Sequence, residues 1–214
     1  LFEQFEGYNG LETIDLRAYA GRSVPMDVVL GRARTARSQV IKQADVVALL
    51  ALLPDKYSTG IVETNFDHYE PRCGHGSSLS TAMHGLVAAR LGQTERAIDL
   101  FRRTGAIDLG DDKAAIAGGI HIAAQGGVWM MAVLGFAGVS LRDDGIEVSP
   151  RIPQDWKALR FPLQWRGRRL SIDVEAGSIR ILLETGEPMA VYLTAARYRL
   201  EQGRALVIDL SSGP

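Results

Sequence analysis

The spacing of apolar residues along the chain changes near residue 140. Before that point apolar positions recur every three or four residues, as in 79–91, which is the spacing of one face of a helix. After it they alternate with polar residues, as in 159–165, which is typical of strands with one buried face. The pattern therefore predicts an α+β fold by segment, with a helical domain over 1–140 and a small antiparallel β-sheet or sandwich domain over 141–214.

Several helices are expected in the first part. The apolar period and the Pro, Gly, Ser and Thr signals at its ends predict helices at 25–33, 42–53, 78–91, 94–103 and 114–136. The segment 42–53 is apolar on nearly every face, so it should be buried on all sides. Its first turn carries Lys42 and Gln43, which either extend back to solvent or line a cleft. Residues 54–77 are expected to form a loop.

The last predicted helix has an unusual composition. Glycines interrupt it at Gly118, Gly119, Gly126 and Gly127. Each glycine costs roughly 1 kcal/mol of helix propensity relative to alanine, so we expect close helix packing there, or a break near His121. His84 and His121 both lie in apolar periodic stretches, and we expect them to be core histidines rather than ligands.

The second part reads as a series of short strands. Alternating apolar residues predict strands around 146–148, 159–165, 170–174, 179–181, 191–193 and 206–210. Glycine-containing turns separate them, for example at 166–168 and 186–188.

Composition excludes several classes of function. The 214 residues carry 24 Lys and Arg against 25 Asp and Glu, and these are scattered, so neither a nucleic-acid surface nor a membrane partner is expected. No apolar run reaches the ~18–20 residues of a membrane span. The single cysteine, Cys73, fits a reducing compartment, and we expect a cytoplasmic protein. The histidines are spread singly along the sequence, so no metal site is expected.

Polar chemistry is concentrated at residues 70–80, EPRCGHGSSLS. Here His75 stands between two glycines and is followed by serines and a helix start. Such a turn presents free backbone N–H groups and the positive end of a helix dipole, which favours an anion. The hydroxyls of Ser77 and Ser78 and a ring nitrogen of His75 would add donors. From composition alone, ordinary N-capping of the helix by Ser77, Ser78 or Ser80 is the favoured interpretation of the same residues, because serine is common at a helix start.

These motifs together resemble a known family. YEPRCGHGSSLS at 69–80, IKQAD at 41–45, GIHIAAQGGVWMMAVLGFAG at 119–138 and SPRIPQDWKALRFPLQWRGRRL at 149–170 resemble glycoside hydrolase family 65, in the family's own order. The family contains inverting phosphorylases of maltose, trehalose, kojibiose and related α-glucosides, and some hydrolases. The resemblance implies the last helices of an (α/α)6 barrel over 1–140, incomplete in this chain, followed by the family's C-terminal β domain over 141–214.

The resemblance also assigns roles to residues. Lys42 and Gln43 match a pair that contacts the donor glucose, and His75, Gly76, Ser77 and Ser78 match a segment that holds phosphate. The serine pair favours a phosphorylase. No residue of this chain matches the family's general-acid glutamate, so no catalytic residue is assigned here.

The function expected from the resemblance is the C-terminal part of an inverting disaccharide phosphorylase. Its partners would be an α-linked disaccharide and inorganic phosphate as co-substrate, with no other cofactor and no metal. This chain alone is expected to be inactive and to self-associate or to bind a chain that supplies the missing barrel half. Two alternatives remain: a non-catalytic structural or carbohydrate-binding piece, and a trehalase-like hydrolase.

Overall fold

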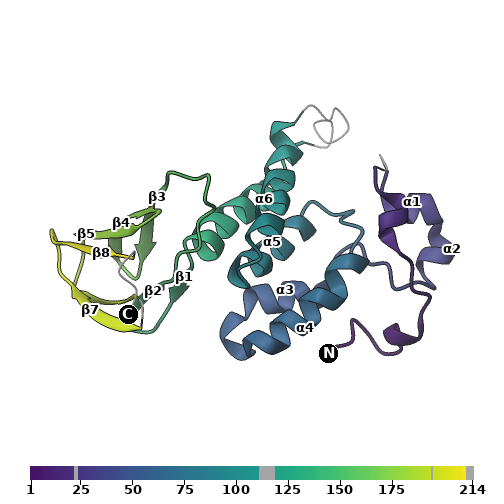
Figure 1. Ribbon diagram of the computed structural model, residues 1–214, viewed down its shortest axis with the longest axis horizontal. Helices are drawn as coiled ribbons and strands as arrows, with labels where there is room; N and C mark the ends of the chain where they lie inside the picture. Colours follow the sequence, from purple (N-terminus) through teal and green to yellow (C-terminus); the bar gives the residue numbers. More distant parts are fainter. Residues whose placement is uncertain (22–23, 111–118, 194, 211–214) are drawn as a thin grey trace. The chain divides into compact units, whose positions relative to one another are not determined.

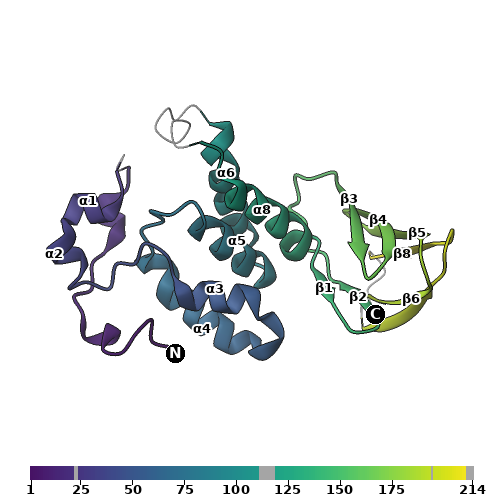
Figure 2. The same cartoon turned by 180° about the vertical axis from the view of Figure 1, so that it is seen from behind.

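The computed structural model describes residues 1–21, 24–110, 119–193 and 195–210. It contains two compact units, Leu1–Met130 and Met131–Pro214. The first unit is helical and the second is built from strands, in agreement with the fold class predicted from the apolar pattern (Figures 1 and 2). Across the described residues, none of the helices combines the length and apolar character that a membrane crossing requires.

The helical unit is built around one buried helix, α5. Its elements are η1 (Tyr8–Gly10), η2 (Leu16–Tyr19), α1 (Met26–Leu30), α2 (Arg32–Thr35), α3 (Asp45–Leu52), η3 (Pro54–Lys56), α4 (Thr59–Tyr69), η4 (Glu70–Arg72), α5 (Ser80–Arg90), α6 (Thr94–Leu109) and α8 (Ile122–Met130). Helix α5 contacts α3, α4, α6 and α8. It buries most of its length because small side chains, such as Ala82, Ala88 and Ala89, let neighbouring helices approach closely.

Two expectations for this unit are wrong. The predicted loop at 54–77 contains α4, whose Phe66 and Tyr69 are fully buried. The segment predicted to be buried on all sides is α3, yet Leu52 is 59% exposed and Leu49 is also exposed, because no described element covers that side of the helix.

The predicted helix at 114–136 is only partly described. Residues 114–118 lie outside the described range, α8 begins at Ile122, and 131–136 form a π-helix. Gly127 of α8 lies close to α5, since a Cβ built on it would be 2.4 Å from the Cβ of Ala82. Gly126 faces open space. Close packing therefore explains one glycine of this pair and not its neighbour.

The second unit consists of two small sheets. Its elements are the π-helix η5 (Met131–Phe136), β1 (Val139–Leu141), β2 (Gly145–Val148), β3 (Ala158–Trp165), β4 (Arg168–Glu175), β5 (Ser178–Thr185), β6 (Met189–Leu193), β7 (Ala196–Leu200) and β8 (Ala205–Asp209). The strand orders are β1-β2-β6-β7 and β3-β4-β5-β8. All pairs are antiparallel except β2 with β6, which is parallel.

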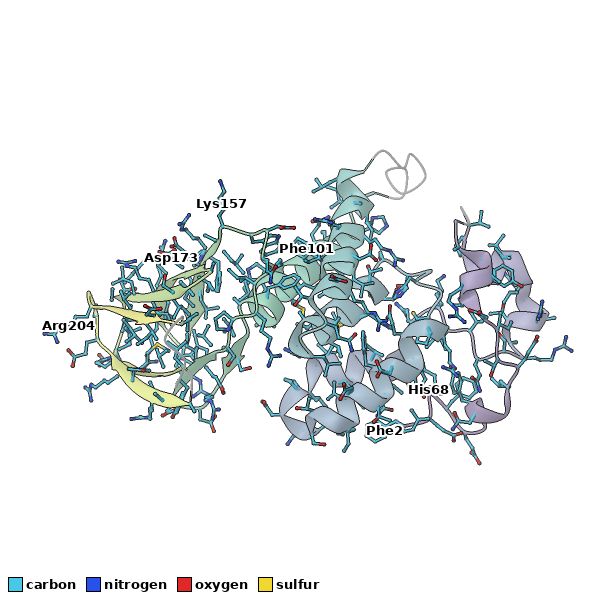
Figure 3. All side chains as sticks on the ribbon, viewed as in Figure 1. Phe2, His68, Phe101, Lys157, Asp173 and Arg204 are labelled. Atoms are coloured by element: carbon cyan, nitrogen blue, oxygen red, sulfur yellow. The ribbon has the colours of Figure 1, made fainter. Side chains whose placement is uncertain are left out.

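The apolar residues that alternate with polar ones along these strands form the core of this unit. Ile172 of β4 pairs with Phe161 and Ile181, and these apolar residues point into a common cluster. The hairpin between β3 and β4 turns at Arg166 and Gly167, both with positive φ (44° and 73°), as a two-residue hairpin turn requires. Polar side chains such as Lys157 and Arg204 extend outward (Figure 3).

Candidate functional site

The stretch singled out in the sequence forms the turn that leads into α5. His75 has a positive φ of 46°, which is uncommon for a residue with a side chain. At Gly76 a Cβ would lie 3.4 Å from Cγ of Lys42 and 3.5 Å from Cβ of Pro25. The turn therefore lies against the segment that precedes α3, and a glycine at position 76 fits this contact.

A hydrogen bond joins the two segments that carry the predicted site residues. Nε2 of Gln43 donates to Oγ of Ser77 over 2.6 Å, although the residues are 34 positions apart. Lys42 and Gln43 precede α3 rather than forming its first turn, and both are exposed. The structure thus brings Lys42, Gln43, Gly76 and Ser77 to one place.

The serines of the turn do not cap α5. The N-cap residue is Leu79, and no side chain bonds to the helix start in the capping manner. Oγ of Ser77 accepts from the backbone N–H of Leu79 (3.3 Å), and Ser80 is already helical, with its hydroxyl donating to the Ser77 carbonyl (3.0 Å). The hydroxyl of Ser78 has no partner among the described residues. The capping interpretation is therefore wrong for this helix, while the site roles of the serines stay a prediction.

A hollow of about 560 Å³ lies over this turn. His75, Gly76, Ser77 and Ser78 line it together with Thr81 of α5 and Arg103 of α6. Sequence reasoning missed Arg103, because nothing in an amphipathic helix 25 positions after Ser78 marks one arginine among its polar residues. Arg103 adds a cation to a wall that already carries hydroxyl, imidazole and backbone donors, and such a set of groups suits an anion.

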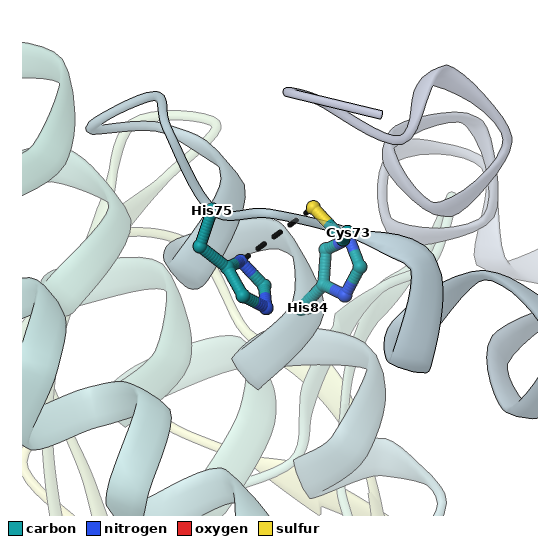
Figure 4. A group of neighbouring side chains, drawn as sticks. All are labelled: Cys73, His75 and His84. Carbon is teal, nitrogen blue, oxygen red and sulfur yellow. Dashed lines mark hydrogen bonds between the residues drawn. The ribbon is translucent and has the colours of Figure 1, made fainter. Parts of the chain in front are cut away.

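Beneath the turn Cys73, His75 and His84 gather in a cluster (Figure 4), which Glu70 joins through its contacts with both histidines. Nδ1 of His84 hydrogen-bonds to Oε2 of Glu70, and Nε2 of His75 lies 3.6 Å from the same oxygen. Sγ of Cys73 lies 3.7 Å from Nδ1 of His75, which also contacts Oγ of Ser80 at 3.1 Å. The side chains of His75 and His84 are 7% and 1% exposed.

These contacts shift the titration of every member of the cluster. Burial alone would raise the pKa of Glu70, but hydrogen bonds to His75 and His84 outweigh it and hold that pKa well below its usual range. Burial opposes charge on His75 as well, but its contacts with Cys73 and Glu70 raise its pKa to about 9. Likewise, burial raises the pKa of Cys73, and the two imidazoles lower it to about 6. The pKa of His84 is raised by Cys73 and Glu70 against the effect of burial.

The sequence did not indicate this cluster. Cys73, His75 and His84 present possible metal-ligand atoms within 4.8 Å of one another, although His84 follows His75 by nine residues and lies in the next helix. The sequence held one signal: His84 follows Ser80 by four residues, so the two share a face of α5. In the structure the hydrogen bond between Nδ1 of His75 and Oγ of Ser80 brings the turn to that face.

His121 is not the core histidine that the sequence predicted. Its side chain is partly exposed and pairs with Asp108 of α6, Nδ1 to Oδ1 over 2.7 Å. Gln125 donates to Oδ2 of the same carboxylate (3.0 Å), and these hydrogen bonds lower the pKa of Asp108. His84 is buried as expected, but only one of its two ring nitrogens has a partner among the described residues.

Comparison with known proteins covers nearly the whole chain. Residues 1–130 match the glycosyl hydrolase family 65 central catalytic domain, and residues 139–200 match the C-terminal domain of the same family. A kojibiose phosphorylase of Escherichia coli K12 is 38% identical over 192 residues, which is 89% of this chain and 25% of that protein. A 1,2-alpha-glucosylglycerol phosphorylase of Bacillus selenitireducens is 37% identical over 95% of this chain and 28% of its own length.

A solved structure agrees with these matches. A putative kojibiose phosphorylase from the human microbiome superposes with a TM-score of 0.89 at 26% identity, over 98% of this chain and 29% of that protein. The chain thus spans about a quarter of the length of the curated relatives that it matches. Both domain matches, their order and the superposition lead to one conclusion: the chain belongs to glycosyl hydrolase family 65.

Proposed function

We propose that this chain is the C-terminal part of an inverting disaccharide phosphorylase that acts on an α-glucoside. In this proposal His75, Gly76, Ser77 and Ser78 hold inorganic phosphate, and Lys42 and Gln43 contact the donor glucose. The general-acid glutamate lies outside the residues of this chain. The division into barrel helices over 1–140 and a β domain over 141–214 belongs to the same proposal, as does a cytoplasmic location.

The observation that carries the proposal is the bond between Gln43 and Ser77 (2.6 Å) beside the hollow. It joins the segment proposed to bind the sugar to the segment proposed to bind phosphate. A displacement reaction requires both reactants within near-attack distance, and holding them there lowers the barrier by removing translational freedom.

The donors around the hollow suit phosphate as the nucleophile. Inverting hydrolysis uses a second carboxylate to activate water, whereas bound phosphate is already a nucleophile and has only to be held and oriented. No carboxylate lines the hollow within the described part of the chain, and Arg103 and His75 are the lining groups able to carry positive charge. Glu70, 3.6 Å from Nε2 of His75, favours the protonated ring, which adds positive charge behind the turn.

The helical unit leaves apolar side chains uncovered, as an incomplete barrel would. Leu109, Ile120 and Ile122 are each more than three-quarters exposed. Exposed apolar side chains mark an interaction surface where they gather in a patch. We infer that further barrel helices, from the same protein or from an associating chain, cover them, and that the chain alone has no phosphorylase activity.

The test of this function is the product formed by the complete enzyme that contains this chain. Kojibiose, trehalose and maltose are incubated with and without phosphate, and the products are followed by NMR. The proposal predicts β-glucose 1-phosphate from one of them, formed only when phosphate is present. Free glucose formed at the same rate without phosphate would favour the hydrolase alternative, and sugar binding without turnover would favour the non-catalytic one.

A further inference from the structure

We propose that Cys73, His75 and His84 form a binding site for a thiophilic transition-metal cation of the Zn²⁺ class. The donor set is one sulfur and two imidazoles, which is the mixture of soft and borderline ligands that selects zinc over magnesium or calcium. The site does not depend on the phosphorylase proposal, but it shares His75 with it: a ring that binds the ion through Nδ1 cannot at the same time be the protonated ring of that proposal.

The spacing of the ligand atoms suits a tetrahedral ion. Bonds of about 2.3 Å to sulfur and about 2.0–2.1 Å to nitrogen, at the tetrahedral angle, place the two ligand atoms roughly 3.5 Å apart. Sγ of Cys73 and Nδ1 of His75 are separated by 3.7 Å. The ligand atoms of all three residues lie within 4.8 Å of one another, so small side-chain rotations would bring them to bonding distance of one ion.

His84 supplies the independent sign of a ligand. Its side chain is 1% exposed, and its Nε2 is buried with no hydrogen-bond partner among the described residues. A buried polar nitrogen without a partner is uncommon in native proteins, and coordination would satisfy it. The other ring nitrogen, Nδ1, is hydrogen-bonded to Glu70. Metal-binding histidines commonly hold a carboxylate in this way through the ring nitrogen that does not bind the metal.

One residue of the cluster borders the hollow over the turn. His75 forms part of the wall of the hollow, whereas Cys73 and His84 are buried and do not line it. In this proposal an ion enters past the His75 ring, and a water molecule from the hollow completes its coordination. Three protein ligands and one water form the common arrangement of an open zinc site.

Cobalt absorption in the folded, reduced 214-residue chain tests the site. Co²⁺ occupies zinc sites and gives a thiolate-to-cobalt charge-transfer band when sulfur is bound. Cys73 is the only cysteine of the chain, so the band reports on this residue alone. We expect the band to saturate at one ion per chain, to be displaced by Zn²⁺ and to vanish when the chain is unfolded. Absence of the band in the folded wild-type chain would overturn the site, whatever the variants do.

Variants assign the ligands. Cys73→Ser should abolish the band and weaken Zn²⁺ binding at least 100-fold, and Glu70→Gln should weaken it by about 10–100-fold. His68→Gln is the matched control, because His68 also has a buried Nε2 without a partner but belongs to no such ligand group among the described residues. Its Zn²⁺ affinity should equal that of wild type. Equal binding by Cys73→Ser, or equal loss in His68→Gln, would contradict the assignment.

Discussion

Adding one methyl group at either of two adjacent glycines should have different effects on stability. Both Gly126 and Gly127 lie inside α8, so replacing either with alanine gains about 1 kcal/mol of helix propensity. A methyl group on Gly126 faces open space. On Gly127 it would lie 2.4 Å from Cβ of Ala82, against the ~3.5–4.0 Å of an ordinary carbon contact. Relieving that overlap should cost about 1–3 kcal/mol.

The propensity gain is common to both variants and cancels between them. Gly127→Ala should therefore be less stable than Gly126→Ala by about 1–3 kcal/mol, with Gly126→Ala above wild type. Urea unfolding followed by far-ultraviolet circular dichroism measures the difference. The double variant Ala82→Gly/Gly127→Ala should be more stable than the sum of the two single effects predicts, because Ala82→Gly removes the methyl group with which the new alanine clashes. Equal stability of Gly127→Ala and Gly126→Ala would contradict the close approach of α5 and α8 at Ala82.

Further predictions concern pH, the β core and activity. Burial raises the pKa of Tyr8 from 10.0 to about 12, so the tyrosine ionises at lower pH in the unfolded chain than in the folded one. Wild type should be more stable than Tyr8→Phe because the Tyr8 hydroxyl donates to the Gln39 carbonyl over 2.6 Å, and this advantage should shrink between pH 10 and pH 12 in urea titrations. A constant advantage over that range would contradict the prediction. Ile172→Ala removes a fully buried side chain of β4 and should lower the free energy of unfolding by about 2–5 kcal/mol. The phosphate dependence of the complete enzyme should stay unchanged, and a change would contradict the assignment of phosphate binding to the turn at 75–78. The purified, monomeric chain alone should form no glucose 1-phosphate in a coupled assay, and clear turnover would refute the missing general acid.

Short-range patterns predicted the elements that bury one regular face. In β4 the alternation of Leu170, Ile172 and Val174 requires one buried face, and all three are fully buried. The sequence predicted α6 from Thr94 to Arg103 with Thr94 as its cap, but Thr94 is the first helical residue, the N-cap position is Gln93 without a side-chain cap bond, and the helix continues to Leu109. The change of period near residue 140 predicted the change of architecture.

Helix α4 could not be predicted in the same way. Its stability depends on contacts with the distant start of the chain, where Tyr69 donates to the Phe2 carbonyl (2.5 Å) and the Phe2 N–H donates to Asn65 (2.7 Å). Such contacts leave no periodic signal in a polar segment. For the same reason the sequence located the turn at 70–80 but not its neighbours: Arg103 and His84 reach it only through the packing of α5 and α6.

The most direct test of the central claim is the phosphate dependence of Ser78→Ala in the complete enzyme, measured together with its melting temperature. Ser78 lines the hollow, and its hydroxyl has no partner among the described residues, so its removal should leave the melting temperature unchanged. Loss of one hydrogen bond to a charged group, worth about 1.5–3 kcal/mol, should raise the phosphate KM by about 10–100-fold. Ser78→Thr, which keeps the hydroxyl, should retain most of the affinity. An unchanged phosphate KM in Ser78→Ala would contradict the claim that this turn holds phosphate.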